Sequence, residues 1–303
     1  MSSYKKSKLL KQHRLEKGFT REELVRGICD TTTLKRYENE GMAPCDDKYR
    51  MLQEKMGGTP EQLYISSELG IFVDGERYQK YEDLLSKHDY DELRVKIPIL
   101  KQSLKSINIL EKQQFLGRLE ILLETETDED KVCELEKLLR VSVPEYKDGN
   151  FSVTKLYNDT ELHIMNDIAI YCSRQEDNQK ADRIYTSLNS YIDQAEDNVD
   201  SLVVIKILFN YANYLGVNKK YKEAIAICKK AIGQLKKNSC QEMMYAFLFN
   251  IGWLYNQMYL ELNEDSYKDL AKDYVKISLS LAKYNNESSK NIGRIEKFYK
   301  NID

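Results

Sequence analysis

A group of polar side chains near the start of the chain has the residue types and spacing that suit contact with nucleic acid. Thr31, Thr32 and Lys35 occupy positions i, i+1 and i+4, so in a helix they lie together on the side opposite Leu34. A threonine contacts a thymine methyl group or a base edge, and a lysine reaches guanine or a phosphate. Arg21 precedes them and is placed for a phosphate contact. The alternative interpretation is that the threonines only form a solvated helix start. The candidate contacts to double-stranded DNA are Arg21, Thr31, Thr32, Thr33, Lys35 and Arg36.

A second group combines asparagine amides with large aromatic side chains much later in the chain. Asn210 and Asn250 occupy the same position in two related helical segments, and an amide both donates and accepts, which suits an extended peptide backbone. Phe209, Phe249 and Trp253 lie beside them and offer apolar pockets for peptide side chains. The alternative is that the aromatic residues pack between helices and the asparagines are only solvated. The candidate peptide contacts are Asn166, Ile170, Arg174, Phe209, Asn210, Asn213, Phe249, Asn250, Trp253 and Gln257.

The residues that usually perform catalysis or bind metals are not arranged in any such pattern. The sequence has no Gly-rich phosphate loop, no pair of histidines at zinc spacing and no nucleophile elbow. Its six cysteines are scattered, as is usual for a reducing cytosol, and no apolar run approaches the roughly 20 residues that span a bilayer. We therefore expect a cytoplasmic protein that is not an enzyme, has no cofactor or metal, and does not enter a membrane.

The composition indicates which elements position these groups. The 303 residues include only 13 Gly and 4 Pro, too few for a sheet protein with many tight turns, so we expect an all-α fold. Charge is uneven: residues 1–60 carry 13 Lys and Arg against 9 Asp and Glu, although the whole chain has a net charge of −3. A basic head on an acidic body favours an anionic partner for the head, but this signal alone is weak.

Residues 1–66 are predicted to form a domain of short helices. Thr20 and Glu23 make a capping box that starts one helix, and Asp30 caps the next helix, Thr31–Glu38. Two helices of about eight residues joined by a short turn are typical of a helix-turn-helix, whose second helix enters the major groove. The remaining helices of this domain are marked by Leu9, Leu10, Leu15 and Gly18, by Asp46 or Asp47 with inward Tyr49, Met51, Leu52 and Met56, and by Thr59.

Residues 67–303 show the pattern of degenerate helical hairpins. The best segment matches the large and small positions of a tetratricopeptide (TPR) repeat, where small residues let two antiparallel helices approach closely. Related segments are separated by 43 residues from Ala181 to Ala224 and by 46 from Ala224 to Leu270, and we expect Leu270 to face inward. The last helix, about Glu287–Lys300, caps the array. The residues of the best segment are Leu208, Tyr211, Ala212 and Leu215, then Tyr221, Ala224, Cys228 and Ala231.

These motifs resemble a known family. The stretch Leu10-Lys-Gln-His-Arg14-Leu-Glu-Lys-Gly18-Phe-Thr20-Arg-Glu-Glu-Leu24 resembles a Cro/C1 (XRE-type) DNA-binding domain. Gly27-Ile28-Cys29-Asp30, followed by Leu34-Lys-Arg-Tyr-Glu38, resembles the version found in the Rgg, PlcR and PrgX (RRNPP) family of peptide-responsive transcription regulators. The hairpin array resembles the body of the same proteins. Arg21 stands where that family usually has Gln, and Asp30 where it often has Ser, so the resemblance leaves the operator open.

The resemblance implies a transcription regulator for quorum sensing: a homodimer with a palindromic operator, and a short re-imported signalling peptide as ligand. It also implies a structural ion pair between Arg14 and Glu38. Two other functions fit the same patterns. One is a TPR scaffold that binds another protein, and the other is a DNA-binding repressor without a small ligand. Salt-dependent duplex binding separates the scaffold from both regulators, and a peptide-dependent change in that binding separates the regulators from each other.

Overall fold

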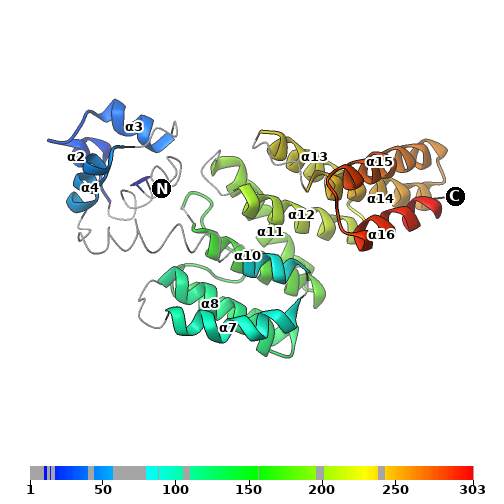
Figure 1. Cartoon of the computed structure of the whole chain (residues 1–303), viewed down its shortest axis with the longest axis horizontal. Helices are drawn as coiled ribbons and strands as arrows, with labels where there is room; N and C mark the ends of the chain where they lie inside the picture. The colour runs from blue at the N-terminus through cyan, green and yellow to red at the C-terminus, as the bar shows by residue number, and fades with distance from the viewer. Residues whose placement is uncertain are drawn as a thin grey trace. The chain divides into compact units, whose positions relative to one another are not determined.

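The computed structural model is helical throughout its regular structure. It describes residues 10–11, 14, 18–39, 44–56, 80–87, 89–104, 110–155, 157–195, 201–237 and 243–302. Within these ranges the extended backbone is limited to one isolated bridge between Lys147 and Asn150, and the predicted all-α class is confirmed. The chain divides into two compact units, Met1–Ser103 and Leu104–Asp303 (Figure 1). The expected domain boundary after residue 66, the helix expected from Thr59, and Leu9 and Leu15 lie outside the described residues.

The first unit begins with the expected short helices α2 (Arg21–Val25), α3 (Thr31–Asn39) and α4 (Asp46–Lys55). The predicted capping box is present at α2, because the Glu23 amide donates to Thr20 Oγ1 over 3.2 Å and the Thr20 amide donates to Glu23 Oε2 over 2.8 Å. Gly27 has a φ of +82° in the turn that follows, a conformation that favours glycine. The turn thereby delivers the chain into α3.

The core of these three helices is apolar and compact. Leu24, Leu34 and Leu52 are completely buried, one from each helix. Met51 was expected to face inward, but it is 45% exposed. The buried positions of α4 follow Tyr49 with spacings of three and four residues, which leaves Met51 on the outer side of the helix. Helix α7 (Tyr90–Leu104) follows later in the chain.

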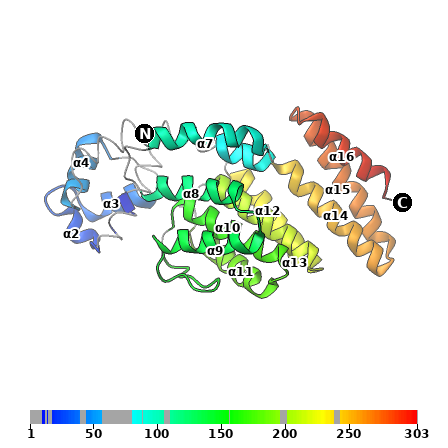
Figure 2. The same cartoon turned by 90° about the horizontal axis from the view of Figure 1, so that it is seen from below.

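The second unit is an array of antiparallel helical hairpins, as predicted. Each helix contacts the next one along the chain from α8 to α16, and α12 also contacts α10 and α14, so the first helices of successive hairpins lie side by side (Figure 2). One continuous core runs through this stack. The helices are α8 (Leu110–Glu124), α9 (Asp128–Arg140), α10 (Asp159–Arg174), α11 (Asn178–Ala195), α12 (Ser201–Val217), α13 (Tyr221–Lys237), α14 (Met244–Leu262), α15 (Asp265–Tyr284) and α16 (Ser289–Lys300).

Small residues set the approach of α14 and α15. A Cβ added to Gly252 would lie 2.5 Å from Val275 Cγ2 and 3.1 Å from the carbonyl oxygen of Ala271. Ala271 is fully buried, whereas Leu270, expected at the inward position, is 37% exposed. The expectation was wrong by one residue, because the closest approach of the two backbones requires the small side chain of Ala271 rather than a leucine.

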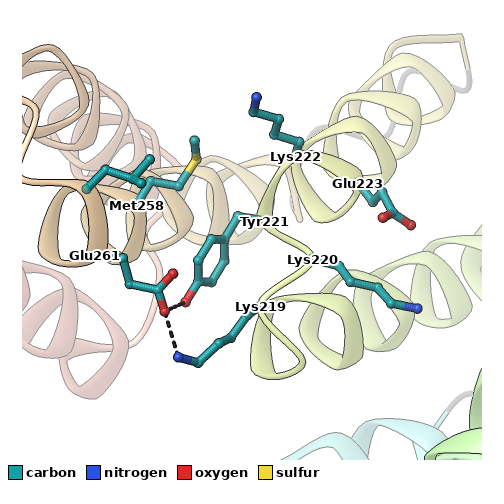
Figure 3. A pocket seen from close by; sticks show the side chains of 8 residues that line it. Lys219, Lys220, Tyr221, Lys222, Glu223, Met258 and Glu261 are labelled. Atoms are coloured by element: carbon teal, nitrogen blue, oxygen red, sulfur yellow. Dashed lines mark hydrogen bonds and ion pairs between the residues drawn. The ribbon is translucent and has the colours of Figure 1, made fainter.

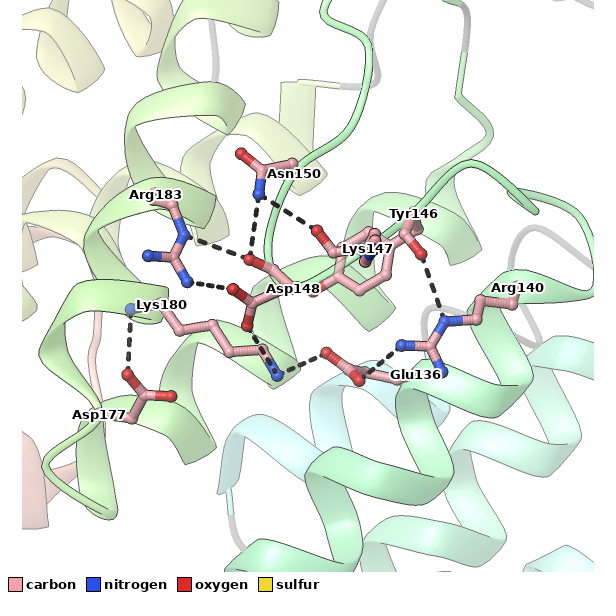
Figure 4. A network of polar contacts seen from close by, with 9 residues as sticks. All are labelled: Glu136, Arg140, Tyr146, Lys147, Asp148, Asn150, Asp177, Lys180 and Arg183. Atoms are coloured by element: carbon pink, nitrogen blue, oxygen red, sulfur yellow. Dashed lines mark hydrogen bonds and ion pairs between the residues drawn. The ribbon is translucent and has the colours of Figure 1, made fainter.

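The long connection between α9 and α10 is fixed by a polar network (Figure 4). Lys180 Nζ on α11 lies 2.6 Å from Glu136 Oε1 on α9, and Arg183 Nη2 lies 2.8 Å from Asp148 Oδ2 in the connection. Burial opposes the charge of Lys180, but the bond to Glu136 holds its pKa above the ordinary value. The network therefore joins α9, the connection and α11 at the start of the array.

Candidate functional site

The outer face of α3 presents most of the residues predicted to contact DNA. Thr32, Lys35 and Arg36 are exposed, and Thr31 and Thr33 are half-buried. The Thr33 hydroxyl donates to Asp30 Oδ2 over 2.6 Å, and the Thr33 amide donates to Asp30 Oδ1 over 2.7 Å. These bonds lower the pKa of Asp30 and cap the helix as predicted. The hydroxyl of Thr33 is thus engaged at the helix start, while Thr32 and Lys35 face outward.

Glu38, which lies near the end of α3, forms ion pairs with two arginines from other parts of the first unit. Arg14 Nε lies 2.6 Å from Glu38 Oε1, and Arg21 Nε lies 2.8 Å from Glu38 Oε2. The Glu38 side chain is fully buried, and Arg14 also donates from Nη1 to the carbonyl of Phe19 over 2.8 Å. Since a buried carboxylate needs compensating charge, this cluster ties α2 and α3 to the first helix.

The second arginine of this cluster was proposed from sequence only as a phosphate contact. The Arg21 side chain is 34% exposed, so part of its guanidinium remains at the surface while Nε bonds to Glu38. Nothing in the local spacing signals this pairing, because the two residues are 17 positions apart in sequence. Glu38 therefore fixes the direction of the side chain that sits at the start of α2.

In the second unit, asparagine amides join the first helices of successive hairpins. Asn210 Nδ2 on α12 donates to Asn166 Oδ1 on α10 over 3.3 Å. Asn250 Nδ2 on α14 donates to Asn213 Oδ1 on α12 over 2.8 Å. Each primary amide has two N–H donors and a carbonyl with two lone pairs, so these single bonds leave further hydrogen-bonding capacity. The predicted asparagines thus form two bridged pairs across three helices.

The accessibility of these amides differs. Asn166 is only 4% exposed, Asn210 and Asn250 are half-buried, and Asn213 is exposed. Asn213 is followed one turn later by Val217, which is 73% exposed although it is apolar. Sequence reasoning missed Val217, whose position four residues after Asn213 is the available signal.

The face of α14 has a similar order of residues. Asn250, Trp253 and Gln257 are half-buried and follow one another at spacings of three and four residues. Leu260 comes next at the same spacing and is 65% exposed, another apolar residue that the sequence reasoning missed. Each of the helices α12 and α14 therefore has a row of side chains that begins with an amide and ends with an exposed aliphatic residue.

The three aromatic residues predicted to contact a peptide make different contacts. Phe209 meets Phe247 edge to face with centroids 5.5 Å apart, and Phe249 meets Phe298 of α16 in the same way at 5.3 Å. Both contacts are those of helix packing, the alternative stated above. Trp253 instead covers Gly216 of α12, where an added Cβ would lie 2.9 Å from Trp253 Cζ3. The indole thus lies at the joint between two hairpins.

The remaining predicted groove residues lie on α10. Ile170 is half-buried, and Arg174 is exposed with its guanidinium 5.1 Å from the centroid of the Tyr171 ring. Lys131 of α9 lies 5.3 Å from the same ring. Cation–π contact therefore holds Arg174 at the end of α10.

A separate cavity of about 270 Å³ opens where α13 begins and α14 ends (Figure 3). Tyr221 Oη donates to Glu261 Oε1 over 2.8 Å, and Lys219 Nζ lies 2.9 Å from the same oxygen. These two bonds lower the pKa of Glu261, the one with Lys219 more strongly. The residues predicted to contact a peptide do not line this cavity, and three of its polar groups, those of Lys219, Tyr221 and Glu261, bond to one another. The lining residues are Lys219, Lys220, Tyr221, Lys222, Glu223, Met258, Glu261 and Leu262.

Among the described residues, no group of three or more His, Cys, Asp or Glu side chains is arranged to hold a metal ion. In the same part of the chain, no helix combines the length and the apolar character needed to cross a bilayer.

Comparison with known proteins identifies the fold. No protein-family profile and no curated protein sequence matches the chain. Among solved structures, PlcR from Bacillus thuringiensis in complex with the peptide PapR7 and DNA is 21% identical, with a TM-score of 0.51 over 93% of this chain and 97% of that chain. The apo form of PlcR is 17% identical, with a TM-score of 0.50 over 92% and 97%.

ComR from S. thermophilus, in complex with DNA and its signalling peptide ComS, is also similar. It is 17% identical, with a TM-score of 0.53 over 98% of this chain and 99% of that chain. At these identities the likeness shows the fold, so the predicted Rgg, PlcR and PrgX type is confirmed at the level of the fold.

Proposed function

We propose that this chain is a DNA-binding transcription regulator controlled by a short peptide that binds the groove formed by α10, α12 and α14. One observation carries the proposal: an α3 face with exposed Thr32, Lys35 and Arg36 is joined in one chain to an array that presents bridged amides. The fold is shared over more than nine-tenths of the chain with PlcR and ComR, each of which is known in a complex with DNA and a peptide. This combination supports a regulator for quorum sensing in the cytoplasm, and a binding protein rather than an enzyme.

On DNA, α3 enters the major groove. Thr32 and Lys35 contact base edges, with Thr31, Thr33 and Arg36 beside them, and Arg21 contacts a phosphate while Glu38 fixes its direction. A single head makes few base contacts, so a homodimer reads two half-sites of a palindromic operator.

In the groove, an extended peptide bonds to Asn210, Asn213 and Asn250. These backbone contacts give affinity that depends little on sequence, whereas Trp253, Val217 and Leu260 select apolar side chains. A ligand shifts DNA binding only through different affinities for two conformations, so peptide binding changes either the spacing of the hairpins or that of the two heads.

The DNA part is tested by selecting a duplex from a random pool with the full chain. On the selected duplex, Thr32→Ala should lose about 1–3 kcal/mol per half-site relative to scrambled DNA, as expected for a base contact. Arg21→Ala should weaken all duplexes about equally. Thr154→Ala, at a site in the second unit, is the control. The absence of salt-dependent duplex binding would favour the protein-interaction scaffold instead.

The peptide part is tested with ligands selected from a random heptapeptide library on the immobilised full chain. For a selected peptide, Asn210→Ala or Asn250→Ala should cost about 1–3 kcal/mol of binding measured by calorimetry, because each leaves a buried polar partner unpaired. DNA binding without peptide should be nearly unchanged. Selected peptides that bind both variants like the wild type would place the ligand elsewhere, and the failure to select any peptide would favour a repressor without a small ligand.

A further inference from the structure

Five arginines belong to the second unit, and they differ in what holds the guanidinium group. Three of them form ion pairs with carboxylates at 2.5, 2.9 and 2.8 Å, namely Arg118, Arg140 and Arg183. The other two, Arg174 and Arg294, are exposed and lie over aromatic rings. The distance to the ring centroid is 5.1 Å for Tyr171 and 6.0 Å for Phe249, respectively. Within the described residues, neither of these two guanidinium groups has a carboxylate partner.

The ring contacts leave the hydrogen-bonding groups of both arginines available. A cation is attracted to the face of a ring, so the contact orients the guanidinium without using its N–H donors. The guanidinium can then bind a carboxylate through two parallel N–H···O bonds. Glu176 and Asp177, both described, follow Arg174 in the chain without forming an ion pair with it. Asp177 instead accepts from the Lys180 amide over 3.1 Å.

Arg174 lies at one end of the row of first helices. It is the last residue of α10 and follows Ile170 by four residues. Val217 follows Asn213 on α12 by the same interval, and 43 residues separate the equivalent positions of the two repeats. Arg174 therefore occupies the repeat position of Val217, on the face of the array that carries the bridged amides.

Arg294 lies at the other end, because α16 continues the row beyond α14. Helix α16 packs against α15, and its Phe298 meets Phe249 of α14. Asn291 Nδ2 of α16 also donates to Tyr245 Oη of α14 over 3.4 Å. Arg294 lies between these two contacts along α16, and so at the edge of the predicted groove, to which Phe249 belongs.

The acidic side chains of α10, α12, α14 and α16 are engaged by other groups. Their partners are Arg118 for Asp167, Lys219 and Tyr221 for Glu261, Lys283 for Glu296, and the Asn158 amide for Glu161. Asp159 of α10 and Lys206 of α12 also interact within the chain. Lys290, Lys297 and Lys300 of α16 are exposed and add positive charge at one end of the row. The unmatched charge of these helices is therefore positive.

We propose that Arg174 and Arg294 bind carboxylates at the two ends of the groove, so that the ligand is an acidic peptide with one carboxylate near each end. Three steps between neighbouring helices of 8–10 Å amount to roughly 24–30 Å. An extended heptapeptide spans about 23–25 Å, and the arginine side chains cover the remainder. The positive charge also rejects basic peptides. This inference rests on the proposed function and names the chemical class of its peptide.

Peptides selected from the random heptapeptide library on the immobilised full chain test the class. They should carry Asp, Glu or the free C-terminal carboxylate near both ends. For such a peptide, Arg174→Gln or Arg294→Gln should raise the dissociation constant at least about tenfold in calorimetry, equivalent to about 1.4 kcal/mol. Lys300→Gln is the matched control, since it removes the same charge from an exposed position of α16 away from the ring, and it should leave the affinity nearly unchanged.

A double-mutant cycle separates carboxylate binding from a role of the arginines in packing. Each end carboxylate of the selected peptide is replaced by an amide, which should weaken binding to the wild type but not to the variant that lacks the matching arginine. Selected peptides that are neutral or basic, or that bind both glutamine variants like the wild type, overturn this inference and leave peptide binding standing. Acidic peptides that need both arginines but do not change duplex binding support it and overturn the proposed regulation. A library that yields no peptide overturns both.

Discussion

In the hairpins α12–α13 and α14–α15, the two helices differ sharply in charge. The first helices α12 and α14 contain one charged residue each, Lys206 and Glu261. The second helices α13 and α15 contain six and seven. A helix with so few charged residues needs to be covered on most sides, and α12 contacts four other helices of the array, which leaves Asn213 and Val217 exposed. The difference teaches that α12 and α14 hold the stack together, while α13 and α15 form its outer surface.

The comparison also shows which kind of polar group joins the first helices of the hairpins. The polar groups that join α10, α12 and α14 are amides, which hydrogen-bond without the desolvation cost of a charge. The exception is α10, where Asp167 is buried and pairs with Arg118 of α8 at 2.5 Å.

The largest expected effect comes from removing the buried ion pair between Asp167 and Arg118. Asp167→Ala should lower the free energy of unfolding by about 3–5 kcal/mol, because the buried Arg118 guanidinium would lose its ion pair with this carboxylate. Urea denaturation measures the loss. Glu134→Ala, which removes an exposed partner of Lys137, should leave the stability nearly unchanged.

Replacing both buried partners separates the charge from the packing. Asp167→Leu with Arg118→Leu should recover most of the stability that either single change loses, because no charge is then left buried. A double variant as unstable as Asp167→Ala would show that the site is required for its shape rather than for its charge.

The next effect concerns the contact between the two kinds of helix. Gly252→Ala should destabilise the protein by about 3 kcal/mol, since the new methyl group meets the backbone of α15 as well as a side chain. Gly233→Ala is the matched control on α13, where an added Cβ meets nothing within 4 Å. That change should stabilise the helix by about 0.5–1 kcal/mol. Equal effects of the two substitutions in thermal unfolding would contradict the close approach of α14 and α15.

A smaller effect is expected between the first helices. A double-mutant cycle of Asn213→Ala and Asn250→Ala should give a coupling of about 1 kcal/mol in the free energy of unfolding, the usual net value of one hydrogen bond. The pair Asn166 and Asn210, whose amides are 3.3 Å apart, should couple less strongly. Coupling near zero for both pairs would mean that the amides do not hold α10, α12 and α14 together.

The smallest expected effect is a difference in the reactivity of the cysteine thiols, which leaves stability unaltered. Burial raises the pKa of the Cys172 and Cys228 thiols to about 12, so both stay protonated well above neutral pH. Cys45 and Cys133 are exposed. A thiol reagent at mildly alkaline pH should therefore label Cys45 and Cys133 first, as read by mass spectrometry, because the thiolate is the nucleophile. Early labelling of Cys172 or Cys228 would show that the hairpins open.

Local chemistry made the helix starts and the hairpin pattern predictable from sequence. The capping box of Thr20 and Glu23 and the cap at Asp30 each depend on residues three positions apart, and both form as expected. Ala224 and Ala231 were recognised because small residues recur where antiparallel helices touch, and both are fully buried. The register of the last hairpin was predicted one residue off, with Leu270 where Ala271 lies, because the extra length of this hairpin lies in α14 and α15 themselves and only two residues connect them.

Contacts between distant segments were harder to predict. Asn210 and Asn250 share a repeat position, yet Asn250 bonds to Asn213 rather than to Asn210, one turn further along α12. The inclination of one hairpin against the next decides such a partner, and repeat spacing does not encode it. The bond of Arg21 to Glu38 likewise depends on how α2 and α3 fold against each other.

The position of the only tryptophan gives the protein a built-in optical probe. The Trp253 indole is half-buried and rests on Gly216, so its emission wavelength reports the polarity at the seam between α12 and α14. A change in the spacing of α12 and α14 should move that ring relative to Gly216 and alter its exposure to water. Steady-state fluorescence of the unlabelled protein should therefore report such a change, and Gly216→Ala should shift the starting wavelength by displacing the ring.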